Sequence, residues 1–288
     1  MSKRPTKNLS SANKKEARAV EEIVHPPKNP MQIIPTGHVP ESRNCPHCGT
    51  DLPPRETELM GTVFYAIRRC QCELDEYDRE QQEFQNAERQ RRLDRLFQGA
   101  RLGKRFRACT FDSFVLRPGT EEAYAIVKDF AKRFKAGTGQ GYLLAGGYGS
   151  GKTHLVAATV QHLIERFVPA VFVVVPELLD QIKATYNRQS DITESSIVSA
   201  IQGADLVVLD DLGAEQVTDW MQVKLYTIIN GLYGRMASVL VTTNCTPGEL
   251  EDRLGGKTYS RLVEMLDVLP VTAKDYRMRK LRVPQEDR

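Results

Sequence analysis

The stretch Leu143–Leu163, LLAGGYGSGKTHLVAATVQHL, decides the fold of this 288-residue chain. Within it, Gly146–Thr153 fits the pattern G-x-x-x-x-G-K-[ST], with an apolar strand-like run before it and a helical pattern after it. Glycines allow backbone N–H groups to approach a phosphate, and the N-terminus of the following helix adds its dipole. The stretch therefore predicts a nucleotide phosphate site, but it does not say which nucleotide-driven protein the site serves.

The whole loop is a predicted contact surface for ATP. Lys152 is expected to reach the β- and γ-phosphates, and the Thr153 hydroxyl is expected to bind Mg²⁺. The predicted contacts are Gly146, Gly147, Tyr148, Gly149, Ser150, Gly151, Lys152 and Thr153.

A second acidic motif follows in Ala204–Glu215, ADLVVLDDLGAE, where an apolar strand runs directly into two carboxylates. Ligands of parallel α/β sheets sit at this end of the strands. We expect Asp210 to hold Mg²⁺ through water and Asp211 to orient or activate the attacking water. Asp211 could instead cap a turn, and Glu215 is near enough in sequence to compete for the role of base.

Two further polar residues extend the predicted site. The strand SVLVTTN ends at Asn244, whose amide is placed to contact both the γ-phosphate and the attacking water, or simply to cap a turn. Arg261 lies in LGGKTYSRLVEML, on a helix with an apolar face. An arginine there is either an ordinary surface charge or a residue that reaches the nucleotide of a neighbouring subunit. Near the end, DYRMRK contains Arg277, which belongs to a basic tail or points at the γ-phosphate.

Alternating strand and helix patterns surround these motifs and predict a parallel α/β sheet with helices on both faces. An extra strand lies between the phosphate-loop strand and the acidic strand, so these two are not expected to be sequential neighbours. Strands are predicted at 142–145, 170–175, 205–209, 238–242 and 268–271, and helices at 120–135, 152–167, 176–186, 191–203, 217–234, 247–254 and 258–266.

The N-terminal third has a different composition. Residues 1–44 are polar, proline-containing and basic near the start, which predicts a disordered tail that is either merely solvated or binds nucleic acid or an acidic partner. Residues 73–98 lack Gly and Pro and predict a solvated helix, either a connector or a partner-binding helix. We therefore divide the chain into a tail (1–44), a cysteine module with linker helix (45–98) and an ATPase domain (99–288).

Composition sets broad limits. The net charge of +3 is too small to indicate nucleic-acid binding by itself, and the longest apolar run, which begins at Ala170, has the length of a buried strand. With no signal-peptide pattern after Met1, we expect a cytoplasmic protein without a membrane segment. In a reducing compartment the six cysteines do not indicate a disulfide framework.

Four of those cysteines are spaced C-x2-C-x21-C-x-C, at Cys45, Cys48, Cys70 and Cys72. Four thiolates of this kind predict a closed, tetrahedral, structural zinc site, although C-x-C is tighter than the usual C-x2-C. His47, inside the first pair, is the alternative ligand. Cys109 and Cys245 are isolated and are expected to be small buried thiols.

In this order, the motifs GSGKTHL, LVVLDDLGAE, VTTN, RLGGKTYSRL and DYR resemble the AAA+ ATPases of the DnaC/DnaI helicase-loader family. GKRFRACTFDSF (103–114) is similar to that family's entry into the ATPase domain, and the cysteines resemble the zinc module of its DnaI-like members. The resemblance covers roughly residues 45–284.

This resemblance implies an AAA+ P-loop fold with strand order 5-1-4-3-2 and an ATP-dependent oligomer. It implies Arg261 as the arginine finger and Arg277 as the second sensor. The chain ends about 18 residues after Pro270, so no helical lid is expected. Loaders often have Gly-Glu-Arg where this chain has Gly255, Gly256 and Lys257, so no role is assigned to Lys257.

The implied partners are a hexameric replicative helicase, contacted by the zinc module, and single-stranded DNA. Lys183, Tyr186 and Arg188 lie where the family is thought to contact DNA, though the same residues would suit an ordinary solvated helix end. The implied function is ATP-driven loading of the helicase onto single-stranded DNA in the primosome. The alternatives are an IstB-like transposition ATPase, against which the cysteine module argues, and a non-hydrolysing nucleotide-gated adaptor, which a complete set of catalytic residues disfavours.

Overall fold

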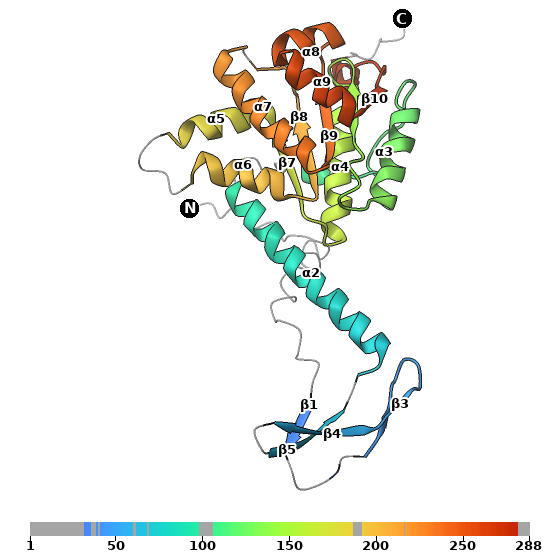
Figure 1. The fold of residues 1–288 in the computed structure, drawn as a ribbon. Coiled ribbons are helices and arrows are strands. Elements are labelled where there is room, and N and C mark those ends of the chain that lie inside the picture. The colour runs from blue at the N-terminus through green and yellow to red at the C-terminus, as the bar shows by residue number, and fades with distance from the viewer. Residues whose placement is uncertain are drawn as a thin grey trace, which may run out of the picture. The chain divides into compact units, whose positions relative to one another are not determined.

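The computed structural model describes residues 32–35, 39, 41–59, 62–67, 69–97, 106–186, 192–215 and 217–281. The chain divides into two compact units, Met1–Asn86 and Ala87–Arg288 (Figure 1).

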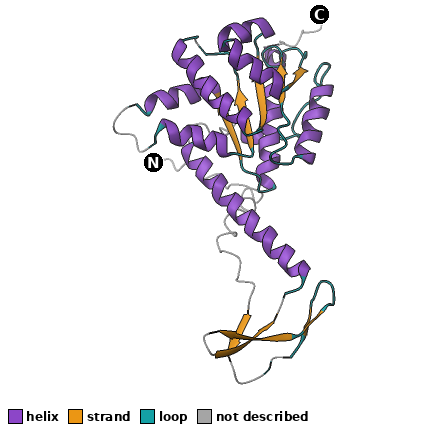
Figure 2. Ribbon diagram, in the orientation of Figure 1, coloured by secondary structure: helices purple, strands orange, loops and turns teal. Residues whose placement is uncertain are grey.

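The second unit is built on a five-stranded parallel sheet (Figure 2). Its order is β10-β6-β9-β8-β7, which in chain order is the predicted 5-1-4-3-2 arrangement. The phosphate-loop strand β6 and the acidic strand β8 are therefore not neighbours, as predicted, because β9 lies between them, whereas the extra strand in the sequence, β7, lies at the edge of the sheet. The strands are β6 (Tyr142–Ala145), β7 (Ala170–Val174), β8 (Leu206–Asp210), β9 (Ser238–Thr243) and β10 (Asp267–Pro270).

Helices cover both faces of this sheet, and the predicted elements between residues 120 and 271 are all present (Figure 1). Two helices pack on one face, α3 (Glu121–Arg133) and α4 (Lys152–Glu165). The opposite face is covered by α5 (Val175–Ala184), α6 (Glu194–Gly203), α7 (Asp219–Gly234), α8 (Pro247–Leu254) and α9 (Gly256–Met265).

The central strands are apolar throughout because both of their faces are buried. In β8, Val207 and Leu209 join the core on the α5–α9 face, whereas Leu206 and Val208 join the core on the α3–α4 face. This alternation leaves the carboxyl ends of the strands as the place where polar side chains can gather. The last residue of β8 is Asp210.

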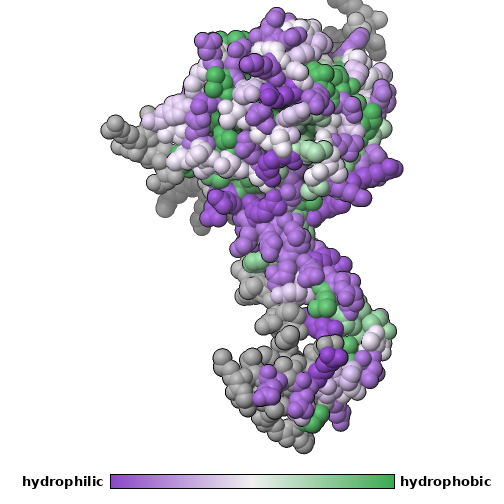
Figure 3. Space-filling view, viewed as in Figure 1, coloured by the Kyte–Doolittle hydropathy of each residue, from purple (hydrophilic) through white to green (hydrophobic). Residues whose placement is uncertain are grey.

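The long helix α2 (Gln71–Leu96) is more than the solvated connector that the sequence predicted. Its surface is largely hydrophilic, as expected (Figure 3). Its C-terminal part belongs to the second unit, however, because Leu93 and the following Phe97 are buried in the core. The Gln90 amide also exchanges two hydrogen bonds with the backbone of Ala170, at the start of edge strand β7, of 2.8 and 3.1 Å. The two compact units therefore divide inside α2, after Asn86, whereas the sequence placed a boundary at residue 98.

The first unit holds two small antiparallel sheets, β1-β5-β4 and β2-β3. Its strands are β1 (Gln32–Pro35), β2 (Arg43–Asn44), β3 (Asp51–Leu52), β4 (Pro54–Leu59) and β5 (Thr62–Ile67). β1 and β2 fall in the predicted tail, so that prediction is corrected for these residues. β1 pairs with β5, more than 25 residues further along the chain, and a local proline-rich composition cannot reveal such a partner.

The rest of the described chain adds two short 3-10 helices, η1 (Phe106–Ala108) and η2 (Tyr276–Leu281). Between β10 and Leu281 the described residues form no helical lid, only η2. Among the helices that the structure describes, none is both long and apolar enough to cross a bilayer.

Candidate nucleotide-binding site and cysteine cluster

The predicted phosphate loop connects β6 to α4 at the carboxyl edge of the sheet. Gly149 and Gly151 have φ angles of 65° and 113°, a region that L side chains adopt at a cost. A Cβ on Gly146 would collide with the backbone carbonyl of Val271, so this glycine is required by close packing. The Tyr148 side chain is 72% exposed, so the tyrosine contributes its backbone to the loop while its ring faces outward.

Lys152 is the first residue of α4, and its ammonium group lies inside the loop. Nζ donates to the carbonyl oxygens of Gly146 and Gly147, both at 2.8 Å. It also donates to Oδ1 of Asn244 at 2.6 Å. The structure therefore brings together the lysine and the asparagine that the sequence predicted from segments 92 residues apart.

Asp210 is the polar centre of the site. It is 1% exposed, and its Oδ1 accepts hydrogen bonds from Thr153 Oγ1 at 3.0 Å and from Thr242 Oγ1 at 2.6 Å. The two predicted magnesium ligands, Thr153 and Asp210, are thus in direct contact. A hydroxyl and a carboxylate are oxygen ligands of the kind that Mg²⁺ prefers, so this pair fits the ion.

The electrostatics follow from burial. Desolvation, together with the charge of Asp211, raises the pKa of Asp210 to about 6, against the opposing hydrogen bonds from the two threonines and the charge of Lys152. Desolvation also lowers the pKa of Lys152, and the positive charge of Arg277 acts in the same direction. Asp211 and Asp210 oppose that shift, so the site holds both signs of charge at short range.

The two candidates for the base differ in their surroundings. Asp211 starts the turn after β8 with a φ of 56°, and its N–H donates to Thr242 Oγ1 at 2.9 Å. Glu215 is buried, and its carboxylate accepts from the N–H of Gly213 at 3.1 and 3.2 Å. Burial raises the pKa of Glu215. Its oxygens are therefore engaged by the backbone of its own turn, whereas the Asp211 side chain is partly open to solvent.

The two arginines of the prediction occupy different places. The guanidinium of Arg261, on α9, stacks on the rings of Tyr226 and Tyr233 of α7, at 4.7 and 5.8 Å. Arg277 is exposed, and its N–H donates to Asp275 Oδ1 at 2.8 Å. Within one chain, Arg277 follows the turn at Asp275, whose carboxylate packs against Gly149 of the phosphate loop. The contacts described for Arg261 lie instead between α9 and α7.

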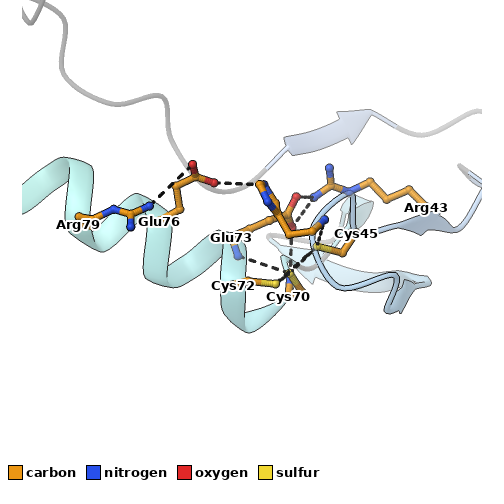
Figure 4. Close-up of polar contacts among 8 residues, drawn as sticks. Arg43, Cys45, Cys70, Cys72, Glu73, Glu76 and Arg79 are labelled. Atoms are coloured by element: carbon orange, nitrogen blue, oxygen red, sulfur yellow. Dashed lines mark hydrogen bonds and ion pairs between the residues drawn. The ribbon is translucent and has the colours of Figure 1, made fainter.

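The four predicted cysteines form one cluster in the first unit, and their sulfur atoms all lie within 4.8 Å of one another. The sulfurs of Cys45, Cys70 and Cys72 face a common point (Figure 4). Their separations are 3.0 Å for Cys45–Cys70, 3.0 Å for Cys70–Cys72 and 3.7 Å for Cys45–Cys72. Four sulfurs at such spacing fit around one tetrahedral zinc ion with Zn–S bonds of about 2.3 Å.

The cysteine cluster lies at the start of α2. The N–H of Glu73 donates to Cys70 Sγ at 3.4 Å, while the Glu73 carboxylate accepts from the N–H of Cys70 at 3.1 Å. This is a capping box in which sulfur replaces the usual hydroxyl. Arg43 pairs with the same carboxylate at 2.8 Å (Figure 4). The neighbouring Cys45 and burial raise the pKa of the Cys70 thiol, and the hydrogen bond from the Glu73 N–H opposes that shift.

His47 is not part of this cluster. Its Nε2 lies 3.3 Å from a carboxylate oxygen of Glu76, and the group of possible metal ligands in the described chain consists of the four cysteines. Its backbone N–H donates to Cys45 Sγ at 3.4 Å. The histidine therefore supports a ligand sulfur through its backbone, and the geometry favours the four-cysteine set over the alternative with His47.

The predicted DNA contacts are described only in part, because Arg188 lies outside the described residues. Tyr186 donates its hydroxyl proton to Glu194 at 2.7 Å and accepts a hydrogen bond from Trp220 at 3.2 Å. The Lys183 ammonium lies 5.0 Å above the Trp220 ring. The structure thus adds Trp220, from the start of α7, to the two residues that the sequence indicated.

Comparison with protein-family models gives one match, over residues 78–283, to the IstB-like ATP binding protein model. The chain belongs to this family. The matched region contains the phosphate loop, both acidic residues and the two arginines, and it begins after the last cysteine of the cluster.

Relatives of this IstB-like protein include replicative helicase loaders. DnaI of Bacillus subtilis (strain 168) is 30% identical over 144 residues, which cover 49% of this chain and 44% of DnaI. DnaC of Escherichia coli (strain K12) is 23% identical over 218 residues, 74% of this chain and 88% of DnaC. The match to DnaI thus spans less than half of that relative.

Among solved structures, the crystal structure of the DnaC helicase loader aligns with a TM-score of 0.54 and 25% identity, covering 59% of this chain and 99% of that one. Together with the sheet order, this likeness confirms the predicted AAA+ P-loop fold for the second unit.

Sequence reasoning missed two residues of the site in this IstB-like unit. The Thr242 hydroxyl hydrogen-bonds the Asp210 carboxylate and the Asp211 N–H. Its place near the end of the strand before Asn244 could have indicated a site residue. Arg117 donates to Ser150 O at 3.0 Å and to Lys274 O at 2.6 Å. No pattern in the sequence connects Arg117 to residues so distant along the chain.

We expect Asp210→Asn to stabilise the protein at neutral pH when nucleotide and divalent cations are absent. The pKa of this carboxyl rises from 3.8 in the unfolded chain to about 6 in the fold. Folding therefore favours the protonated carboxyl. The free energy of unfolding is highest when Asp210 is protonated, and it falls as the pH rises through about 6. At roughly 1.4 kcal/mol per pH unit, the charged form costs about 3 kcal/mol at pH 7.5.

Urea unfolding between pH 5 and 8, followed by the fluorescence of the single tryptophan, measures this effect. The gain from Asp210→Asn should shrink as the pH falls toward 5. Asp180→Asn, at a side chain that is 80% exposed, is the matched control and should give no comparable gain. A gain for Asp210→Asn that is the same at every pH would contradict the assignment.

Proposed function

We propose that this protein is an ATP-dependent loader of a hexameric replicative DNA helicase onto single-stranded DNA, acting in the cytoplasm. The observation that carries the proposal is the assembled site of Lys152, Asn244 and Asp210, in a chain whose relatives include the helicase loaders DnaC and DnaI. The cysteine cluster outside the family match supplies a separate surface for the partner.

ATP and Mg²⁺ would bind at the carboxyl edge of the sheet. Lys152 would exchange its contacts with the loop carbonyls for the β- and γ-phosphates, and Ser150 Oγ is a buried group without a hydrogen-bond partner in the described chain. Thr153 and Asp210 would hold the ion, which neutralises phosphate charge when bound. Asp211 would orient the attacking water, because the Glu215 carboxylate is engaged by Gly213.

Hydrolysis would require a second copy of the chain. Arg261 would reach the nucleotide of the neighbouring subunit, and its stacking on Tyr226 and Tyr233 would keep the guanidinium in one orientation. The exposed ring of Tyr148, in the phosphate loop, suits a surface that self-association covers. Arg277 would sense the γ-phosphate of its own subunit.

The cysteine cluster would bind zinc and make the helicase-binding surface of the first unit. Its buried apolar core is small, consisting of Leu52 with Cys45 and Cys70 among the described residues. A module of this size cannot bury enough apolar surface to fold alone, so a metal would supply the missing stability. A rigid module outside the shared ATP-binding region is suited to partner recognition.

Single-stranded DNA would bind at Lys183, Tyr186 and Trp220. A cation and two aromatic rings on one surface provide phosphate contact and base stacking. The transposition ATPase remains the alternative that the family description suggests, and the identity of the retained partner separates the two.

Arg261 tests whether the site is completed by a second subunit. We expect Arg261→Ala to leave ATP binding nearly intact and to lower turnover by a factor on the order of 10³ in the assembled state, because transition-state charge loses its partner. Mixing it with Lys152→Ala should restore part of the activity, since mixed interfaces combine an intact loop with an intact arginine. Steady-state ATP hydrolysis measures the turnover of Arg261→Ala alone and of the mixture. Arg235→Ala, at an exposed arginine, is the control and should keep normal turnover. Unchanged turnover, or no rescue in the mixture, would rule out a role in trans.

A further prediction concerns the cysteine cluster. The purified chain should contain one zinc ion, and Cys70→Ser should lose it together with helicase binding while keeping ATP affinity. Cys109→Ser, in the other unit, is the matched control and should keep both. Metal analysis and a tagged pull-down from the native host with ATP or ADP give the readouts. Retention of a transposase in place of a hexameric helicase would move the assignment to the transposition ATPase.

Another prediction concerns DNA. Oligothymidylate should quench the single tryptophan, Trp220, and binding should weaken as salt rises. Lys183→Ala should lower the affinity several-fold in anisotropy measurements with labelled DNA. Lys132→Ala, at an exposed lysine on α3, should have no such effect. Equal binding of duplex and single strands, or binding without quenching, would exclude this surface.

A further inference from the structure

Arg117 joins two segments of the nucleotide site that are far apart in the sequence. Its Nη2 donates to the carbonyl oxygen of Ser150 at 3.0 Å and lies 3.5 Å from that of Gly149, both in the phosphate loop. Its Nη1 donates to the carbonyl oxygen of Lys274 at 2.6 Å, and the guanidinium lies 4.9 Å from the Tyr276 ring centre. One side chain therefore contacts the loop and the segment after β10.

The segment after β10 is also fastened directly to the phosphate loop. The N–H of Tyr276 donates to the carbonyl oxygen of Gly149 at 3.0 Å. The Asp275 carboxylate packs against the Cα of Gly149, where any Cβ would collide with it. The same carboxylate accepts the N–H of Arg277 at 2.8 Å. The position of Arg277 thus follows from that of residues 274–276.

The chemistry of these contacts requires arginine. Backbone carbonyls from two segments and an aromatic face surround one planar group, which a forked guanidinium matches and a single ammonium does not. Arg117 Nε is buried without a hydrogen-bond partner in the described chain. That donor has a desolvation cost, so the carbonyl and ring contacts must outweigh it. The side chain is held by its guanidinium end, at the place where the two segments meet.

We propose that Arg117 is a positioning residue that couples the phosphate loop to residues 274–277 and thereby sets Arg277 against the γ-phosphate. A triphosphate that moves Gly149 and Ser150 also moves the carbonyl oxygens to which Arg117 donates. Because Arg117 also contacts residues 274–276, the segment that carries Arg277 moves with the loop. The proposal deepens the proposed ATPase function and rests on it for the catalytic effect. The mechanical link itself is independent of hydrolysis.

Arg117→Lys keeps the charge and removes the fork, so it is the informative variant. In the assembled protein we expect kcat to fall about tenfold or more while KM changes no more than about threefold. In an Arg277→Ala background, Arg117→Lys should cause no further loss, because its effect passes through Arg277. Arg166→Lys is the matched control: Arg166 also donates to two backbone carbonyls, those of Ala131 and Lys132, away from the loop. It should keep normal kinetics.

Hydrogen exchange supplies a second readout that needs no turnover. Without nucleotide, Arg117→Lys should raise the exchange of the amides of Thr272 and Tyr276, whose hydrogen bonds run to Gly119 and Gly149. In the wild type, a non-hydrolysable ATP analogue should change exchange in 272–278 more than ADP does, and Arg117→Lys should remove that difference.

The outcomes separate the two proposals. Wild-type kcat in Arg117→Lys, losses that add to those of Arg277→Ala, or unchanged exchange in 272–278 would each overturn the coupling role. A wild-type protein that binds no ATP would overturn the proposed function instead, and the exchange of Thr272 and Tyr276 without nucleotide would still decide the link. A loss of kcat matched by a lower melting temperature in both Arg117→Lys and Arg166→Lys would assign Arg117 to fold stability alone.

Discussion

The buried carboxylate of Asp210 is the interaction on which the nucleotide site depends. It lies at the end of β8 with 1% of its surface exposed, and one of its oxygens accepts hydroxyl hydrogens from α4 and from β9. An ionised carboxylate in such a place is tolerated only when polar groups compensate for lost water. Thr153 and Thr242 provide part of that compensation, and in doing so they tie α4 and β9 to the end of β8.

The same principle explains the arrangement of Lys152. Its ammonium group is surrounded by two loop carbonyls and the Asn244 amide, so the loop satisfies its own cation. A phosphate could replace these contacts with stronger, charge-assisted ones without reshaping the backbone. The left-handed conformations at Gly149 and Gly151, which L side chains adopt only at a cost, give the loop this shape.

Most of the second unit could be predicted because its determinants are local. The apolar runs of β7, β8 and β9 and the phosphate-loop pattern are each contained in about ten residues, and the strand order followed from a family resemblance. The errors have long-range causes. β1 was hidden because its partner β5 is distant, and Arg117 because its role depends on loops that meet only in the fold. The end of α2 was misjudged because two apolar residues in a polar helix do not reveal a buried face.

The two ends of α2 show why composition alone misleads for this helix. At its start, Cys70 and Glu73 cap the helix, because the Glu73 N–H donates to the Cys70 sulfur and the Cys70 N–H donates to the Glu73 carboxylate. At its end, Leu93 is buried with the sheet of the ATP-binding unit. A uniform run rich in Glu, Gln and Arg therefore serves one unit by capping chemistry and the other by apolar burial. Since the family match begins at residue 78, inside this helix, the shared fold extends to the helix but not to the cysteines. The cysteine cluster is therefore a feature of this chain that the family model does not account for.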